Sequence, residues 1–159
     1  MEFTRLYDGA LILEGGGMRG SYTAGVLDFF IDKDLYFKNC YAVSAGACNC
    51  CNYLSKQRGR SYTINVKYAH DKRYAGLSSY ITTGNYFNKE FTMDELPNKL
   101  LPYDYIEYQR TNANFYAVAT NIKTGRPEYL KVENMKKDID YVWASSSLPL
   151  MAKSVKIGD

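Results

Sequence analysis

Ser44 has the sequence position that best suits a chemical role, because it follows an apolar run and precedes a helical pattern. The run 40–43 has the composition of a buried strand, and the helical pattern begins at Ser44. A serine on such a sharp strand-to-helix turn presents its hydroxyl at the end of a sheet. A hydroxyl presented in this way can attack an ester carbonyl when a base accepts its proton.

A triple glycine, Gly15-Gly16-Gly17, supplies the second part of the same chemistry. It follows the apolar run 10–13 and precedes another helical pattern that begins at Ser21. Glycine tolerates positive φ and leaves room for a substrate. Backbone N–H groups in such a turn can stabilise the oxyanion that develops during acyl transfer. The two turns together predict attack on an ester, with Ser44 as nucleophile and the three glycines as oxyanion hole.

At these residues the sequence resembles the patatin-like phospholipase family, which pairs a G-G-G-x-R-G turn with a G-x-S-x-G turn. The glycine turn (Gly15–Gly20) matches the first motif in full. The serine turn (Ala42–Gly46) matches the second except at its first position, where Ala42 replaces glycine, and A-S-S-S-L-P at 144–149 is a third similar segment. The resemblance implies hydrolysis of a lipid acyl ester, of phospholipase A or lysophospholipase type, through a Ser–Asp dyad without metal or cofactor.

The same resemblance gives supporting roles to Arg19, Gly20 and Gly46. Arg19 is expected to brace the glycine turn, to bind an anionic head group or to form a surface salt bridge, and the sequence does not separate these uses. The helix that begins after the glycine turn adds a favourable dipole for an oxyanion.

The aspartate of the dyad would stand in an Asp-Gly-Gly or Asp-Gly-Ala motif after the last strand, where this sequence has none. Asp8 begins a matching tripeptide, but it precedes the first strand, about 20 Å from the end that carries Ser44. Asp159 is followed by no motif. We therefore expect the general base to be absent, and the chain to be a truncated, inactive part of a longer protein.

A dinucleotide-binding loop is the alternative explanation of the glycine turn. Gly15, Gly17 and Gly20 fit the pattern G-x-G-x-x-G between a strand and a helix. That pattern requires an acidic residue at the end of the second strand to hold a ribose, and this sequence has Ser44 there. A nucleotide- or dinucleotide-binding module and a catalytically inactive fragment stay open as alternative functions.

His70 and the cysteines are weaker candidates for chemistry. A Ser–His–Asp triad would have to use His70, but this histidine follows the nucleophile closely in a polar stretch, whereas related hydrolases place it last. Cys48 and Cys51 form a C-x-x-C that includes Cys50, yet no second Cys or His pair supplies further metal ligands. We expect a surface histidine and small packing cysteines.

Composition indicates one ordinary globular domain over residues 1–159. The net charge of +3 is too small to indicate nucleic-acid binding. The 16 tyrosines suit a lipid or lysophospholipid substrate and a transient contact with a membrane surface. No apolar run approaches the ~18 residues that span a bilayer. The absence of a signal-peptide pattern and the crowded cysteines favour a cytoplasmic location.

The order of the elements predicts an α/β three-layer sandwich with a mainly parallel central sheet, because strand and helix alternate within few residues. Residues 59–89 are expected to hold short helices at the mouth of the site. Helices are expected from Ser21, from Ser44, from a capping Thr92 and over 138–144. The predicted strands are 10–13, 40–43, 114–120, its hairpin partner 127–132 and 154–157.

Overall fold

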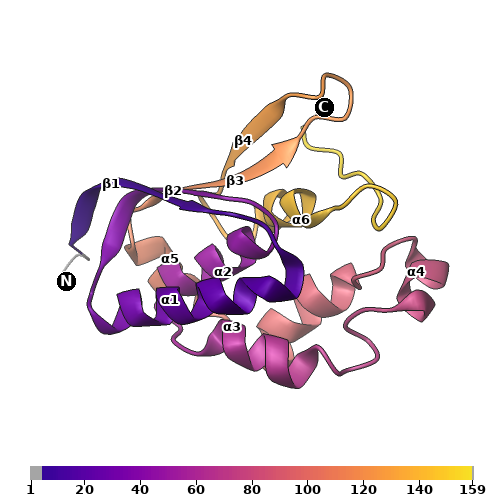
Figure 1. Ribbon diagram of the computed structural model, residues 1–159, viewed down its shortest axis with the longest axis horizontal. Coiled ribbons are helices and arrows are strands. Elements are labelled where there is room, and N and C mark those ends of the chain that lie inside the picture. The colour runs from indigo at the N-terminus through magenta and orange to yellow at the C-terminus, as the bar shows by residue number, and fades with distance from the viewer. Residues whose placement is uncertain (1–4, 159) are drawn as a thin grey trace.

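The computed structural model describes residues 5–158, and its centre is a four-stranded sheet in the order β1-β2-β3-β4 (Figure 1). Strands β1 (Leu6–Leu13), β2 (Tyr36–Ala42) and β3 (Asn114–Thr120) are parallel. Strand β4 (Pro127–Lys131) pairs antiparallel with β3 through a hairpin turn. Leu13 and Ala42 are register partners, so β1 and β2 end at the same edge of the sheet.

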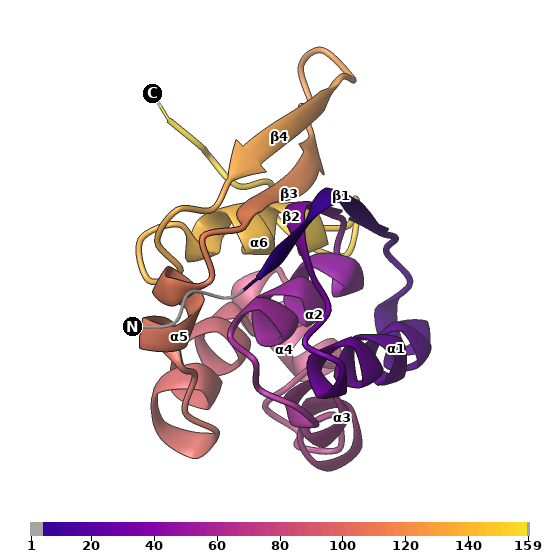
Figure 2. The ribbon, with the colours of Figure 1, turned by 90° about the vertical axis from the view of Figure 1, so that its left-hand side faces the viewer.

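The helices of the described residues lie on one face of this sheet (Figures 1 and 2). The chain steps from β1 to β2 to β3 in one direction, and right-handed crossovers then place both connections on the same face. The helical segments are η1 (Gly17–Arg19), α1 (Gly20–Asp32), α2 (Ala45–Leu54), α3 (Arg60–Thr63), η2 (Ile64–Tyr68), α4 (Leu77–Thr83), η3 (Phe91–Leu100), α5 (Tyr105–Arg110) and α6 (Ile139–Ser146).

The main hydrophobic core lies between the sheet and helices α1, α2 and α6. Side chains alternate along each strand, and the buried set faces the helices. The strands contribute Leu13, Cys40, Ala42, Phe115 and Ala117, and the helices contribute Leu27, Leu54 and Val142. On the opposite face of the sheet, Tyr41 stacks on Tyr116 with ring centroids 5.0 Å apart.

The architecture confirms the predicted α/β class with a mainly parallel central sheet, and the helices within residues 5–158 form one outer layer of the predicted three-layer sandwich. The predicted strands at 10–13, 40–43, 114–120 and 127–132 all form, and β1 and β2 begin earlier than expected. The short helices expected within 59–89 also form.

Two local predictions are wrong. Residues 154–157 form no strand, because alternating side chains make a strand only where a neighbouring strand offers hydrogen bonds, and the described residues supply none there. Thr92 does not start its helix but lies inside it. Asn88 performs the capping, since its Oδ1 accepts a hydrogen bond from the backbone N–H of Phe91 at 3.1 Å.

No helix within residues 5–158 is both long enough and apolar enough to cross a membrane.

Candidate active site

Ser44 occupies a strained turn between β2 and α2. Its backbone has φ 52° and ψ −121°, a conformation that non-glycine residues rarely adopt and that concentrates at functional sites. The turn is closed by a hydrogen bond of 2.8 Å from the N–H of Gly46 to the carbonyl oxygen of Val43. The half-buried Ser44 therefore stands at the start of α2, at the edge where β1 and β2 end.

Gly46 lets α2 approach β1 closely. A Cβ atom at this position would lie 2.6 Å from the carbonyl oxygens of both Leu13 and Glu14, which is far inside van der Waals contact. The close approach also brings the two turns together, since a Cβ on Gly15 would lie 3.1 Å from the Cβ of Ser44. The structure thus places the glycine turn beside the serine turn, as acyl transfer requires.

Arg19 braces the glycine turn. Its backbone N–H donates to the carbonyl oxygen of Gly16 at 3.1 Å, and its side-chain Nε donates to the same oxygen at 3.4 Å. Within residues 5–158 Arg19 forms no ion pair, so of the three uses considered for it, bracing is the one with a contact in the structure. Gly17 has φ +55°, and the space where its Cβ would stand is open.

The N–H groups of Gly15, Gly16 and Gly17 donate no hydrogen bond to another described residue. Unpaired backbone donors beside a serine are the arrangement that stabilises a developing oxyanion. Gly20 begins α1 and is buried against α2, because a Cβ there would lie 3.0 Å from that of Ala45. Glycine at this position therefore keeps the start of α1 close to Ser44.

Ser145 holds the serine turn from the other side. The backbone N–H of Ser44 donates to Ser145 Oγ at 2.9 Å, and that hydroxyl donates to the carbonyl oxygen of Val118 at 2.7 Å. One side chain thereby joins α6, β3 and the serine turn. Ser145 lies in the A-S-S-S-L-P segment at 144–149. Only the fold reveals its contact with Ser44, which is 101 residues away along the chain.

A cavity of about 880 Å³ opens from the two turns and follows α2. Ser44 and the glycine turn line one part of it. Its walls are largely apolar, with contributions from Ile64, Tyr74, Phe87, Met93, Leu96, Met135, Ile139, Val142 and Trp143. A concave, mainly apolar site with a few placed polar groups is what a lipid chain needs.

Neither a carboxylate nor a histidine from the described residues lines this cavity. Asp8 lies near the opposite end of β1 and is exposed, with a distance of 3.8 Å to the ammonium group of Lys38. His70 is exposed. Asp159 lies outside the described residues. The aspartate and histidine that the sequence offered as bases are therefore not brought to Ser44 by residues 5–158.

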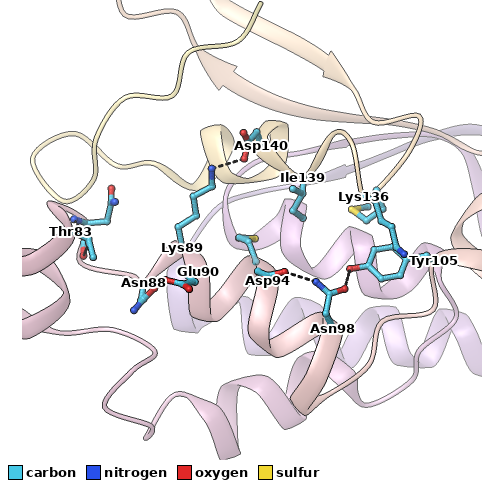
Figure 3. A pocket seen from close by; sticks show the side chains of 13 residues that line it. Thr83, Asn88, Lys89, Glu90, Asp94, Asn98, Tyr105, Lys136, Ile139 and Asp140 are labelled. Carbon is cyan, nitrogen blue, oxygen red and sulfur yellow. Dashed lines mark hydrogen bonds and ion pairs between the residues drawn. The ribbon is translucent and has the colours of Figure 1, made fainter.

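A second cavity of about 680 Å³ lies between η3 and α6, and Figure 3 shows its side chains. Lys89 crosses it to reach Asp140 at 2.6 Å. Asp94 accepts a hydrogen bond from Asn98, which in turn accepts one from Tyr105, each at 2.8 Å. Two of its carboxylates are thus engaged with partners, and Ser44 is not part of its wall.

The cysteines lie in or near the core as free thiols. Cys48 lines the cavity, and burial raises the pKa values of Cys48, Cys50 and Cys51 above that of a free thiol. Raised pKa values keep these groups as neutral thiols, which are poor nucleophiles and poor metal ligands. No group of three potential metal ligands occurs within residues 5–158.

Comparison with known proteins agrees with this geometry. The family described as patatin-like phospholipase matches residues 11–159. The chain is also 27% identical over 148 residues to the uncharacterized protein YjjU of Escherichia coli (strain K12), an alignment that covers 88% of this chain and 40% of YjjU. It therefore spans less than half the length of that relative. Because the family match covers nearly the whole sequence, the chain belongs to the patatin-like phospholipase family.

Proposed function

We propose that the protein is a serine hydrolase of lipid acyl esters, of phospholipase A or lysophospholipase type, with Ser44 as its nucleophile. The observation that carries the proposal is the contact between the two turns, which sets Ser44 directly against Gly15 at the wall of a large apolar cavity. Family membership supports a lipid ester as the class of substrate, and the geometry supports the proposed roles of the residues.

In the proposed reaction, Ser44 Oγ attacks the ester carbonyl carbon while its proton passes to the aspartate of the dyad. The carbonyl oxygen becomes an oxyanion beside the N–H groups of Gly15, Gly16 and Gly17, where preset donors stabilise it. Collapse of this intermediate releases the alcohol, which takes up the proton and leaves an acyl group on Ser44. Water then attacks the acyl-enzyme in the same way and frees the fatty acid.

The base of the dyad is proposed to lie outside residues 5–158. The described part of the cavity wall offers Ser44 no carboxylate, whereas the dyad that the sequence resemblance implies requires an aspartate. We accordingly propose that residues 1–159 alone turn over substrate very slowly. The predicted cytoplasmic location and the transient membrane contact likewise stay proposals.

An exposed apolar patch beside the cavity supports the membrane contact. We define the lipid-facing patch as Leu77, Tyr80 and Ile81 of α4 together with Leu148, Leu150 and Met151. The two segments are joined, because the hydroxyl of Tyr80 donates to the carbonyl oxygen of Leu150 at 2.9 Å. Leu148 also lines the cavity, so the patch adjoins the route by which a lipid would enter. Contiguous exposed apolar surface of this kind marks interaction sites.

Labelling with a fluorophosphonate probe tests the proposed function. The protein, in a form that includes any residues encoded beyond Asp159, should be labelled at Ser44, and Ser44→Ala should remove the label and the ester hydrolysis together. Ser147→Ala is the matched control, since Ser147 directly follows α6 and its hydroxyl donates to the carbonyl oxygen of Trp143. Rapid turnover by residues 1–159 alone would show that the base lies within them.

The same preparation distinguishes the alternative function. A nucleotide-binding module that uses Gly15, Gly17 and Gly20 should bind NAD in solution and resist the probe. Tight NAD binding without labelling of Ser44 would replace the hydrolase proposal by that alternative.

A further inference from the structure

Arg60 is a buried cation without an acidic partner. It begins α3, is only 6% exposed, and forms no ion pair with a described carboxylate. Arginine stays protonated in proteins, and a buried charge is normally paired, because its desolvation is costly. An arginine in this state indicates that something else compensates its charge.

Contacts within the chain compensate only part of Arg60. Its Nη1 donates to the carbonyl oxygens of Leu101 and Pro102, the latter at 2.9 Å, and its guanidinium lies 5.4 Å from the ring centroid of Tyr103. Its Nε is buried and has no hydrogen-bond partner among residues 5–158. A buried donor left unpaired is unfavourable, so an acceptor that reached the Nε would stabilise this side of the guanidinium.

The surroundings of Arg60 are rich in donors. Asn52 and Ser61 are both buried, and Asn52 Nδ2 donates to Ser61 Oγ at 2.8 Å. That bond uses the oxygen of Ser61 as acceptor, which leaves its hydroxyl hydrogen able to donate. Asn52, Arg60 and Ser61 all line the cavity that holds Ser44. Three buried polar side chains therefore line one cavity whose walls are largely apolar.

The distance from the nucleophile follows from helix α2. The cavity wall includes Ala45, Cys48 and Asn52 on this helix. Asn52 comes eight residues after Ser44, which is about 12 Å at the helical rise of 1.5 Å per residue. Ser44 and Asn52 thus lie at two separated points of the same cavity.

We propose that Arg60, Asn52 and Ser61 form an anion subsite, which holds a carboxylate or phosphate group of the lipid while its ester lies at Ser44. The inference rests on the proposed function and deepens it, because it selects lipids that carry an anionic group at a distance from the scissile ester. Arginine suits either anion, since its planar donors match both carboxylate and phosphate oxygens.

Binding to residues 1–159 tests the subsite without any turnover. Trp143 lines the cavity and is the single tryptophan of the sequence, so its fluorescence reports ligand entry. Decyl phosphate, decanoate and the neutral decyl maltoside are titrated below the concentrations at which they form micelles. The native chain should bind at least one of the two anions about tenfold more tightly than the neutral compound, and the stronger of them identifies the preferred anionic group.

Arg60→Gln should lower affinity for the preferred anion about tenfold or more and leave decyl maltoside binding unchanged. Arg58→Gln is the matched control, because Arg58 is exposed and pairs with Asp32 at 2.7 Å outside the cavity. Ser61→Ala offers a milder variant that removes one donor, should Arg60→Gln fail to fold, and it should weaken anion binding about threefold to tenfold.

An equal loss for charged and neutral compounds in Arg60→Gln, or unchanged anion binding in Ser61→Ala, would overturn the subsite and leave Arg60 as a structural brace of residues 101–102. The proposed function fails by a different observation, the absence of Ser44 labelling by the fluorophosphonate probe. Ser44→Ala should retain anion binding, which separates the two results.

Discussion

Gly46 determines the position of Ser44, the proposed nucleophile, because it has no side chain. The carbonyl oxygens of Leu13 and Glu14 each lie 2.6 Å from the point where its Cβ would stand. Backbone atoms cannot rotate away as a flexible side chain can, so any larger residue must move α2 away from β1. Because Ser44 stands at the start of α2, such a shift would also change its distance from the glycine turn.

We therefore expect Gly46→Ala to lower the free energy of unfolding by about 1–3 kcal/mol, the usual effect of overpacking, and to slow fluorophosphonate labelling of Ser44. Urea denaturation and labelling rates measure the two effects. Gly25→Ala is the control, since Gly25 is exposed within α1 and has no atom within 4 Å of its Cβ position. That change should stabilise by about 0.5–1 kcal/mol. A stabilising Gly46→Ala would contradict the close approach.

The sequence predicted the residues whose signal is local. Ser44 and the triple glycine stand in contiguous motifs, so neighbouring letters suffice to find them. Ser145 and Arg60 were not assigned roles, because their significance depends on contacts 101 and 41 residues away along the chain. Arg60 follows Gly59 in a polar segment, and a buried cation in such a segment has no sequence signal that distinguishes it from an exposed one.

At the scale of elements, the difference between local signals and long-range contacts also explains which strands and helices were predicted. Strands β1, β2 and β3 contain apolar runs that must be buried whatever surrounds them. The alternating residues 154–157 need a partner strand, which their own sequence cannot guarantee. Thr92 and Asn88 are both good capping residues, and only the fold decides that Asn88 receives the N–H of Phe91.

Helix α4 carries part of the proposed membrane contact. Ile81 is 73% exposed and lies in the lipid-facing patch. Helix α5 carries a similar residue, Ile106, which is 67% exposed. In Figure 1 α4 lies at the right-hand end of the molecule, whereas α5 lies left of its centre. The two isoleucines are therefore similarly exposed residues on different helices, and only Ile81 belongs to the lipid-facing patch.

We expect Ile81→Asp to reduce binding to phosphatidylcholine vesicles about tenfold or more, because burying an isoleucine contributes about 1.5–3 kcal/mol. Ile106→Asp should leave vesicle binding unchanged. Co-sedimentation with vesicles measures both variants, and circular dichroism checks that each is folded. Equal losses in the two variants would indicate nonspecific adsorption, and no loss in Ile81→Asp would remove α4 from the membrane contact.

At the scale of the whole molecule, buried thiols and phenols make stability sensitive to alkaline pH. Burial is the main cause that raises the pKa values of Cys50, Cys51 and Tyr108. A group with a raised pKa in the folded state keeps its proton when the unfolded chain has lost it. Stability is then complete below the unfolded pKa and declines above it, by about 1.4 kcal/mol per pH unit for each such group. If residues 1–159 form one domain, as predicted, this decline should affect a single cooperative transition.

Tyr36 allows this dependence to be tested at one group. Burial, with the charges of Asp34 and Glu107, raises its pKa to about 12, and its hydroxyl has no hydrogen-bond partner among residues 5–158. Tyr36→Phe should therefore add about 1 kcal/mol to the free energy of unfolding at pH 7. It should also make the decline between pH 10 and 11 smaller by about 1 kcal/mol, because an unfolded phenol is half-ionised near pH 10 and the folded one stays protonated until near pH 12. The ring of Tyr53 stacks on that of Tyr36, with ring centroids 5.1 Å apart. The Tyr53 hydroxyl has a partner, because it donates to the carbonyl oxygen of Leu35. Tyr53→Phe should therefore destabilise the protein at pH 7. Guanidinium denaturation from pH 7 to 11 measures both variants, and a Tyr36→Phe protein that is less stable at pH 7 would show that this hydroxyl has a partner in solution.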